Sequence, residues 1–151
     1  MGIGIKMKDK LEQLRERKNN PLHSDIETFR ELGRAGLIDF TEFLEDGVDW
    51  AFIKVMVEED WCIEEMATSG HYRHRITLIE YNKGREHYEE WKNIDSRVHS
   101  NLAEKGYFYD EFINDASIYI REKAFLSHPE YIKYALNDPG LFLAANNYFY
   151  R

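Results

Sequence analysis

Branched aliphatic residues recur along this chain at a nearly constant interval, and this interval restricts the possible folds more than any other feature of the sequence. Five of them stand 23, 22, 22 and 23 residues apart, at Ile53, Ile76, Val98, Ile120 and Leu143. Gly84, Gly106 and His128 follow three of these positions by eight residues, where a short helix must end and turn. A unit of about 22 residues cannot bury an apolar stripe alone, so several such units must stack and share a core.

The segments between the turns have the periodicity of short helices. Apolar residues recur at helical spacing over segments of about 7 to 12 residues, and no segment has the alternation typical of a strand. The two most similar segments are residues 98–115 and 120–138, which end in Ile-Asn-Asp and Leu-Asn-Asp. We expect Asp115 and Asp138 to cap the helices that follow them.

Two prolines and one capping box predict further helix starts. Pro129 and Pro139 each predict a helix that begins at that residue, because a proline in the first turn loses no hydrogen bond. Near the N-terminus, Ser24 and Glu27 have the spacing of a capping box, which predicts a helix from about Asp25.

The first 20 residues differ from the rest of the chain in charge. They carry six basic and three acidic residues, whereas the rest carries 14 basic and 25 acidic residues, a net charge of −11. Within the basic segment, Met7, Leu11 and Leu14 share one helical face. We therefore divide the chain into a basic N-terminal capping helix, residues 1–20, and an acidic helical repeat domain, residues 21–151. The acidic charge repels phosphate backbones and disfavours general nucleic-acid binding.

One part of the chain resembles a known repeat family. Residues 127–147, with their His-Pro, Asp-Pro and Ala-Asn pairs, resemble the variant leucine-rich repeat, a relative of the HEAT-like α-helical repeats. Residues 95–115 look like a second copy. Family members often place Arg directly after the inward aliphatic residue, as Arg121 is placed here, whereas His99 takes that place in the other copy. The resemblance implies a right-handed stack of paired short helices.

These observations predict an all-α fold. We expect a right-handed α-α superhelix, or solenoid, of about five two-helix repeats of 22–23 residues, preceded by the N-terminal capping helix. No apolar run approaches the roughly 18 residues of a membrane span, so we expect no membrane association. The lone Cys62 and the lack of a visible secretory signal predict a reducing compartment and hence a cytoplasmic location.

Candidate catalytic and metal-binding groups are few. His71 and His74 could share a metal ion on a helix, but no second histidine pair completes such a site. Carboxylates cluster at residues 58–60 and 64–65, where neighbouring acids could share a raised pKa, although such runs usually lie on solvated helix faces. No nucleophile motif occurs. We therefore predict no catalytic, cofactor-binding or metal-binding residue and no enzymatic activity.

Aromatic residues are the main compositional excess, with ten Tyr, nine Phe and three Trp. Most must fill the core, but consecutive rings on short helices cannot all point inward. Tyrosine offers a large contact area at low entropic cost, and acidic residues beside several of the rings would suit a basic protein partner. The sequence predicts a partner-binding surface of seven residues: Tyr107, Tyr109, Asp110, Glu111, Glu130, Tyr131 and Tyr134.

The sequence therefore favours a non-catalytic protein-protein interaction module with an unidentified protein partner and no cofactor. One alternative is an acidic inhibitor that mimics nucleic acid, like phage-type anti-defence proteins. Another is a HEAT-like DNA-processing enzyme, which would need a cationic groove made from the arginines of the body: Arg73, Arg75, Arg85, Arg97 and Arg121. A third is self-association through an unfinished stack end at residues 141–151.

Overall fold

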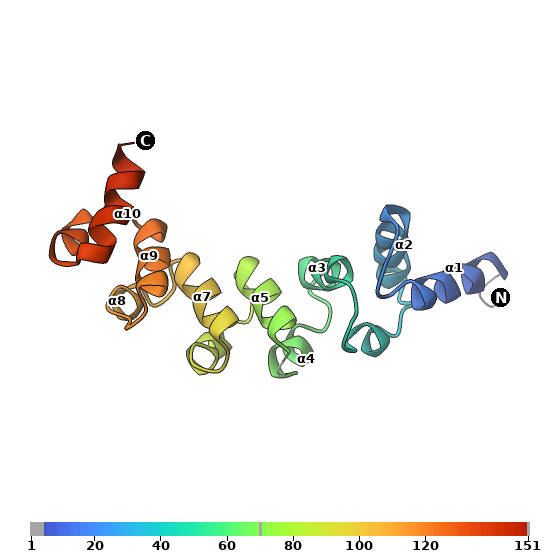
Figure 1. The fold of residues 1–151 in the computed structure, drawn as a ribbon. Coiled ribbons are helices and arrows are strands. Elements are labelled where there is room, and N and C mark those ends of the chain that lie inside the picture. The colour runs from blue at the N-terminus through green and yellow to red at the C-terminus, as the bar shows by residue number, and fades with distance from the viewer. Residues whose placement is uncertain (1–4, 70, 151) are drawn as a thin grey trace. The chain divides into compact units, whose positions relative to one another are not determined.

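The structure is a computed structural model that describes residues 5–69 and 71–150. All regular secondary structure in these ranges is helical, in ten α-helices and three 3-10 helices, with no strand (Figure 1). This confirms the predicted all-α class, whereas the stacking of the helices into a solenoid stays a prediction. None of the described helices has both the length and the apolar character needed to cross a bilayer.

The chain divides after Gly84 into two compact units, which we describe separately. The helices of the N-terminal unit are α1 (Ile5–Glu16), α2 (His23–Arg34), η1 (Phe40–Phe43), α3 (Trp50–Glu58), α4 (Ile63–Thr68) and α5 (Tyr72–Glu80), where η denotes a 3-10 helix. Those of the C-terminal unit are η2 (Arg85–His87), α6 (Tyr88–Trp91), α7 (Ser96–Glu104), α8 (Tyr109–Phe112), α9 (Ile118–Ser127), η3 (Ile132–Asn137) and α10 (Pro139–Phe149). The predicted domain boundary at residue 20 stays a prediction.

Helices α2, α3, α5 and α7 end in the same Schellman motif. In each, the residue after the C-cap has a φ between 56° and 85°. The next backbone N–H donates to the carbonyl five residues back, over 2.8–3.0 Å. The positive-φ residues are Gly36, Asp60, Asn82 and Gly106. The turn predicted at Gly106 is confirmed, the turn after α5 begins two residues before Gly84, and α9 ends differently because His128 has a φ of −141°.

Aligning these helices on their common cap identifies the positions that face the core. Side chains four residues apart lie on the same face of an α-helix, and the residue after the second one lies on the adjoining side. In α3, α5 and α7 the side chains at these positions are at most 1% exposed: Phe52, Met56 and Val57; His74, Leu78 and Ile79; Val98, Leu102 and Ala103. The first position of each trio therefore repeats after 22 and then 24 residues.

Two of the five recurring aliphatics do not line the core, and the prediction that all five do is wrong there. Ile76 is only half-buried and Leu143 is 64% exposed. Each lies two residues past a buried side chain of its helix, His74 or Leu141, and two residues turn an α-helix by about 200°. The other three aliphatics are at most 7% exposed: Ile53, Val98 and Ile120.

Aspartate side chains start several helices. Asp49, Asp95 and Asp138 each accept a hydrogen bond from a backbone N–H in the first turn of the helix that follows, over 2.8–3.3 Å. This confirms Asp138 as a cap and Pro139 as the first residue of α10. Asp115 instead accepts from the Ser117 N–H at 2.9 Å, in the turn that leads into α9.

One predicted helix start is confirmed with a different capping residue, and one is wrong. Helix α2 begins at His23, near the predicted Asp25, but the capping oxygen belongs to Asp25 and not to Ser24: the Asp25 carboxylate accepts from the Leu22 N–H at 2.7 Å. At the other position, a turn follows Pro129 and η3 begins only at Ile132. A proline fits the first turn of a helix but fits a turn equally well.

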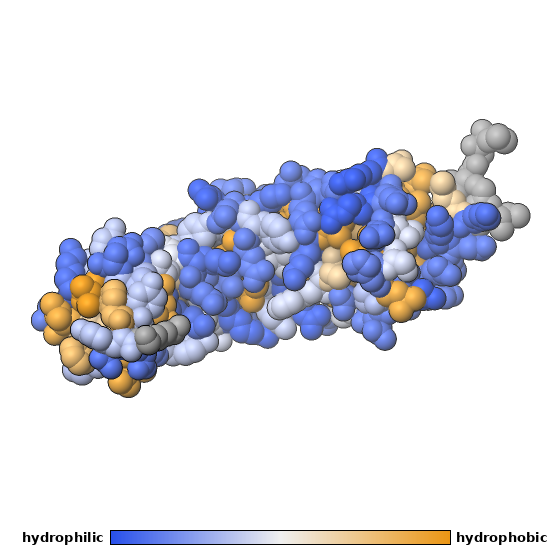
Figure 2. All heavy atoms as spheres, turned by 90° about the horizontal axis from the view of Figure 1, so that it is seen from above, coloured by the Kyte–Doolittle hydropathy of each residue, from blue (hydrophilic) through white to orange (hydrophobic). Residues whose placement is uncertain are grey.

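Phenylalanine rings fill the core of the N-terminal unit, as expected for most of the aromatic residues. The Phe29 ring centroid lies 4.6 Å from that of Phe43 and 4.9 Å from that of Phe52, and each side chain is at most 2% exposed. In the face of the molecule shown in Figure 2, polar residues cover most of the surface, and hydrophobic residues show over the C-terminal helices and also towards the N-terminal end.

Candidate partner-binding surface

Four of the seven predicted partner-binding residues surround one hollow on the C-terminal unit. The hollow has a volume of about 360 Å³. We call it the tyrosine hollow, and its lining residues are Tyr109, Asp110, His128, Tyr131, Lys133 and Tyr134. They come from the start of α8, the turn between α9 and η3, and the first part of η3.

Local backbone geometry brings the rings of the tyrosine hollow together. Tyr109 opens α8 directly after Phe108, whose φ of 54° turns the chain sharply. The Tyr109 ring centroid lies 5.1 Å from His128, 5.4 Å from Tyr131 and 5.9 Å from Tyr134. The rings meet at interplanar angles of 50° to 84°, the tilted and edge-on arrangements that aromatic pairs prefer. One aromatic side chain thus contacts three others.

The Tyr109 hydroxyl is the chemically unusual group of this surface. It is buried and has no hydrogen-bond partner among the described residues. Burial, and next the neighbouring Tyr134, raise the pKa of Tyr109 to about 12, so the hydroxyl keeps its proton and can donate. A buried hydroxyl without a partner costs roughly 1 to 3 kcal/mol.

Charged groups flank the rings on both sides. Lys133 Nζ lies 5.4 Å from the Tyr134 ring centroid, within the range of a cation–π interaction. Glu130 Oε1 lies 3.4 Å from His128 Nδ1, and Asp110 is exposed beside Tyr109. The tyrosine hollow therefore combines aromatic rings, one of which has the Lys133 ammonium beside it, with the carboxylates of Asp110 and Glu130 at its edge.

The other predicted residues lie outside the lining. The Tyr107 ring packs edge-on against Tyr88, at 4.9 Å, and both oxygens of Glu111 accept hydrogen bonds from Lys92, at 2.7 and 2.9 Å. Glu130 reaches the hollow only through His128. His128 and Lys133 also line the hollow but are not predicted from the sequence, because their contribution depends on where η3 begins.

The acidic run at residues 58–60 is paired with basic side chains. Arg30 donates to Glu58 at 2.8 Å and to Glu59 at 2.7 Å, and Arg34 also donates to Glu59. Hydrogen bonds from Tyr81 and then Arg30 lower the pKa of Glu58, and those from Arg34 and Arg30 lower the pKa of Glu59. The possibility of a shared, raised pKa is therefore wrong for these two carboxyls.

The two histidines considered for a metal ion are tied to other partners. Their ring centroids lie 5.0 Å apart. His71 Nε2 lies 2.9 Å from Asp46 Oδ1, and His74 Nδ1 lies 2.8 Å from Ser69 Oγ. Burial, and next the neighbouring His71, lower the pKa of His74 to about 4, so its ring is neutral at pH 7. His74 occupies the core position that Phe52 holds in α3.

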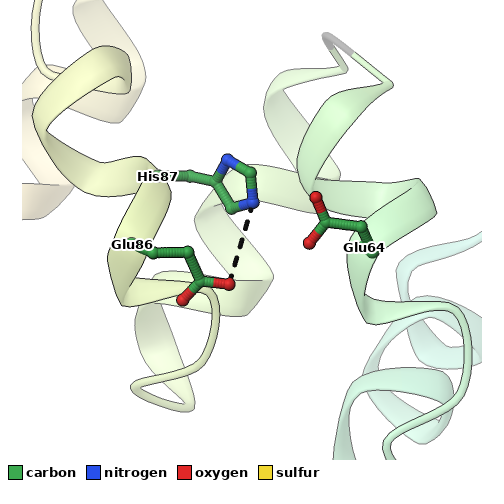
Figure 3. A group of neighbouring side chains, drawn as sticks. All are labelled: Glu64, Glu86 and His87. Atoms are coloured by element: carbon green, nitrogen blue, oxygen red, sulfur yellow. Dashed lines mark ion pairs between the residues drawn. The ribbon is translucent and has the colours of Figure 1, made fainter.

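Another histidine, His87, lies beside a carboxylate, that of Glu86, in the C-terminal unit. Figure 3 shows Glu86 and His87 with Glu64, which belongs to the N-terminal unit. Glu86 Oε1 is 3.8 Å from His87 Nε2, an ion pair at the long end of the range. Two ligands do not make up the three or four protein ligands of a typical zinc site, so we assign no metal to this pair.

The arginines that a nucleic-acid enzyme would need are partly neutralised. Arg97 pairs with Asp95 at 2.9 Å, and Arg121 pairs with Asp138 at 2.7 Å. A guanidinium bound to a carboxylate offers less to a phosphate. No protein-family model, curated protein or solved structure matches this chain, so the arrangement of its own residues carries the functional argument.

Proposed function

We propose that this protein is a non-catalytic interaction module that binds a partner protein through the tyrosine hollow. The observation that carries the proposal is the buried Tyr109 hydroxyl, which lacks a hydrogen-bond partner among the described residues and lies among three other aromatic rings. The hydroxyl is buried in the free protein, so a partner reaches it only when the neighbouring rings move aside, and an acceptor supplied there would recover the hydrogen bond that the free protein lacks. Tyrosine clusters of this kind are typical of the energetic centres of protein interfaces.

The chemistry of the tyrosine hollow favours a basic segment of the partner. The Lys133 ammonium beside the Tyr134 ring is an internal example of the contact that an incoming Lys or Arg would make. Asp110 and Glu130 lie at the edge, and residues 21–151 carry a net charge of −11. Both features attract a cationic surface and steer its approach.

Affinity capture with three baits tests the proposal: the wild-type chain, Tyr131→Ala and Tyr119→Ala. Tyr119 is a matched control because it lies outside the hollow and is 56% exposed, against 44% for Tyr131. The Lys123 Nζ atom lies 5.0 Å from the Tyr119 ring centroid, so this tyrosine also has a lysine beside its ring. We expect at least one protein from nuclease-treated lysate of the source cell to bind the wild type and Tyr119→Ala but not Tyr131→Ala. Equal loss from both variants, or no protein that depends on Tyr131, would contradict the proposal.

Adding duplex DNA to the same affinity-capture experiment distinguishes a protein-interaction module from a mimic of nucleic acid. A mimic occupies the site at which its partner binds nucleic acid, so duplex would displace the captured protein in proportion to its concentration. A module that recognises a basic segment without blocking such a site would keep its partner. We expect the partner to stay bound.

We further propose that the helices form a right-handed solenoid and that the protein acts in the cytoplasm. The support for the solenoid is the common end of α2, α3, α5 and α7, with buried trios that repeat after 22 and 24 residues in the last three. The support for the location is the lone Cys62, which gives the chain no internal disulfide to maintain.

A further inference from the structure

Helix α10 exposes large apolar side chains on the side that faces away from its own core. Leu141, Ala144 and Ala145 are at most 6% exposed and pack inward. Phe142 and Leu143 are 59% and 64% exposed. A helix with apolar residues all around is normally covered on every side.

Exposed apolar side chains gather on α10 and on η3, which precedes it. They enclose a hollow of about 460 Å³ whose lining includes Ile132, Leu136, Phe142, Phe149 and Tyr150. Figure 2 shows the hydrophobic residues that gather at this end of the chain. Leu136 and Leu143, the most exposed leucines among the described residues, project from the same two helices. We call this surface, with Leu143 included, the apolar end face.

Helix α10, which supplies most of the apolar end face, lies in the longest stretch of the sequence without a charged residue, whereas η3 contains one, Lys133. Asp, Glu, Lys and Arg make up 32% of the sequence, but none occurs between Asp138 and Arg151. The Asp138 carboxylate accepts from Arg121 Nε at 2.7 Å and is thereby compensated. The surface formed by α10 thus has nothing with which to attract or repel a charged partner.

We propose that the apolar end face binds a second copy of this chain in a symmetric dimer. Two copies that each carry a charge of −8 repel each other wherever their charged surfaces meet, and an uncharged surface avoids that repulsion. A two-fold interface requires one surface to be complementary to itself. The apolar end face meets this requirement because it supplies both a hollow and projecting leucines.

Sedimentation velocity over a concentration series tests the dimer, with the wild type, Leu143→Glu and Leu126→Glu. Leu126 is a matched control, since it is 46% exposed and lies on α9, outside the two helices that form the apolar end face. We expect the wild type and Leu126→Glu to convert from monomer to dimer with the same dissociation constant. Leu143→Glu should raise that constant at least about tenfold, because each dimer would bury two like charges. Far-UV circular dichroism confirms that each variant is folded.

The salt dependence of the dissociation constant is a second measurement, and it distinguishes dimerisation through the apolar end face from partner binding at the tyrosine hollow. Salt screens the repulsion between two acidic copies, so the dimer should become tighter as ionic strength rises. Binding of a basic partner at the tyrosine hollow should become weaker under the same conditions. A wild type that stays monomeric at every concentration, or a Leu143→Glu variant that dimerises as the wild type does, would overturn the proposal.

Discussion

At the scale of single residues, the contact between Gly33 and Trp61 leaves no space for a side chain. A Cβ added at Gly33 would overlap the Trp61 ring, which cannot withdraw because it stacks on Phe40 at 4.8 Å and 26°. We expect Gly33→Ala to lower the free energy of unfolding by about 1 to 3 kcal/mol, although alanine favours a helix intrinsically. Urea denaturation measures the change.

Gly140→Ala is the matched control for that substitution. Its added Cβ would overlap the Cδ1 and Cγ1 atoms of Ile118, a side chain that is 41% exposed, and would lie at ordinary contact distance, 3.4 Å, from Asp138 Oδ1. The helix preference of alanine should then offset the cost, for a net change within about 1 kcal/mol. Equal losses in the two variants would mean that Trp61 is not fixed.

His74 makes the stability of the N-terminal unit depend on pH. Its pKa is about 4 in the folded chain and 6.5 for a free imidazole, so the unfolded chain takes up a proton first as pH falls. The neutral ring therefore contributes stability that is complete above pH 6.5 and is lost towards pH 4, by about 3 kcal/mol. Replacing it by leucine should flatten this part of the pH profile of the melting temperature. Parallel wild-type and His74→Leu profiles between pH 6.5 and 4 would contradict this assignment.

Tyr109→Phe separates stability from binding at the tyrosine hollow. The substitution removes a buried hydroxyl that has no hydrogen-bond partner among the described residues and leaves the ring in place. We expect the free energy of unfolding to stay the same or to rise by about 1 kcal/mol, because no hydrogen bond is lost. Partner capture should nevertheless weaken. A clear loss of thermal stability would show that the hydroxyl already has a structural role in the free protein.

At the scale of helices, Asp138 combines two tasks at the start of α10. It accepts hydrogen bonds from the backbone of Gly140 and Leu141 and pairs with Arg121. Asp138→Ala should lower the free energy of unfolding by about 1 to 2 kcal/mol, the usual cost of a lost N-cap. Asp138→Asn keeps the capping oxygen and should recover most of this loss in thermal denaturation. If asparagine is as harmful as alanine, the ion pair with Arg121 dominates.

The sequence predicts helices better than it predicts their faces. Helix starts that an aspartate caps can be predicted from the sequence, because the aspartate and the amides that it caps are neighbours along the chain. Which side chains of α5 face the core cannot be predicted from the sequence. The polar His74 occupies the core position that a phenylalanine has in α3, and the aliphatic Ile76 suggests a different face of the helix. The turns at Asp60 and Asn82 cannot be predicted from the sequence either, because such a helix end usually has a glycine at this position.

At the scale of the whole molecule, composition indicates a tyrosine-rich surface, but only the fold selects its members. Tyr109, Tyr131 and Tyr134 meet because α9 ends at a turn and η3 begins late. Tyr107 stands only two residues before Tyr109 in the sequence and packs on Tyr88 instead. Residue type predicts which side chains suit an interface, and backbone geometry decides which of them share one.

Ile120→Asp tests whether the two units unfold as one stack. Ile120 is 7% exposed in the C-terminal unit, so a carboxylate there should cost about 3 kcal/mol or more. In a Trp91→Phe background the remaining tryptophans, Trp50 and Trp61, both lie in the N-terminal unit and report on it by fluorescence. If the helices share a continuous core, as we propose, the fluorescence midpoint in urea should fall together with the circular dichroism midpoint. A fluorescence midpoint that does not move would show that the N-terminal unit folds without help from the rest, which would limit the solenoid to local pairs of helices.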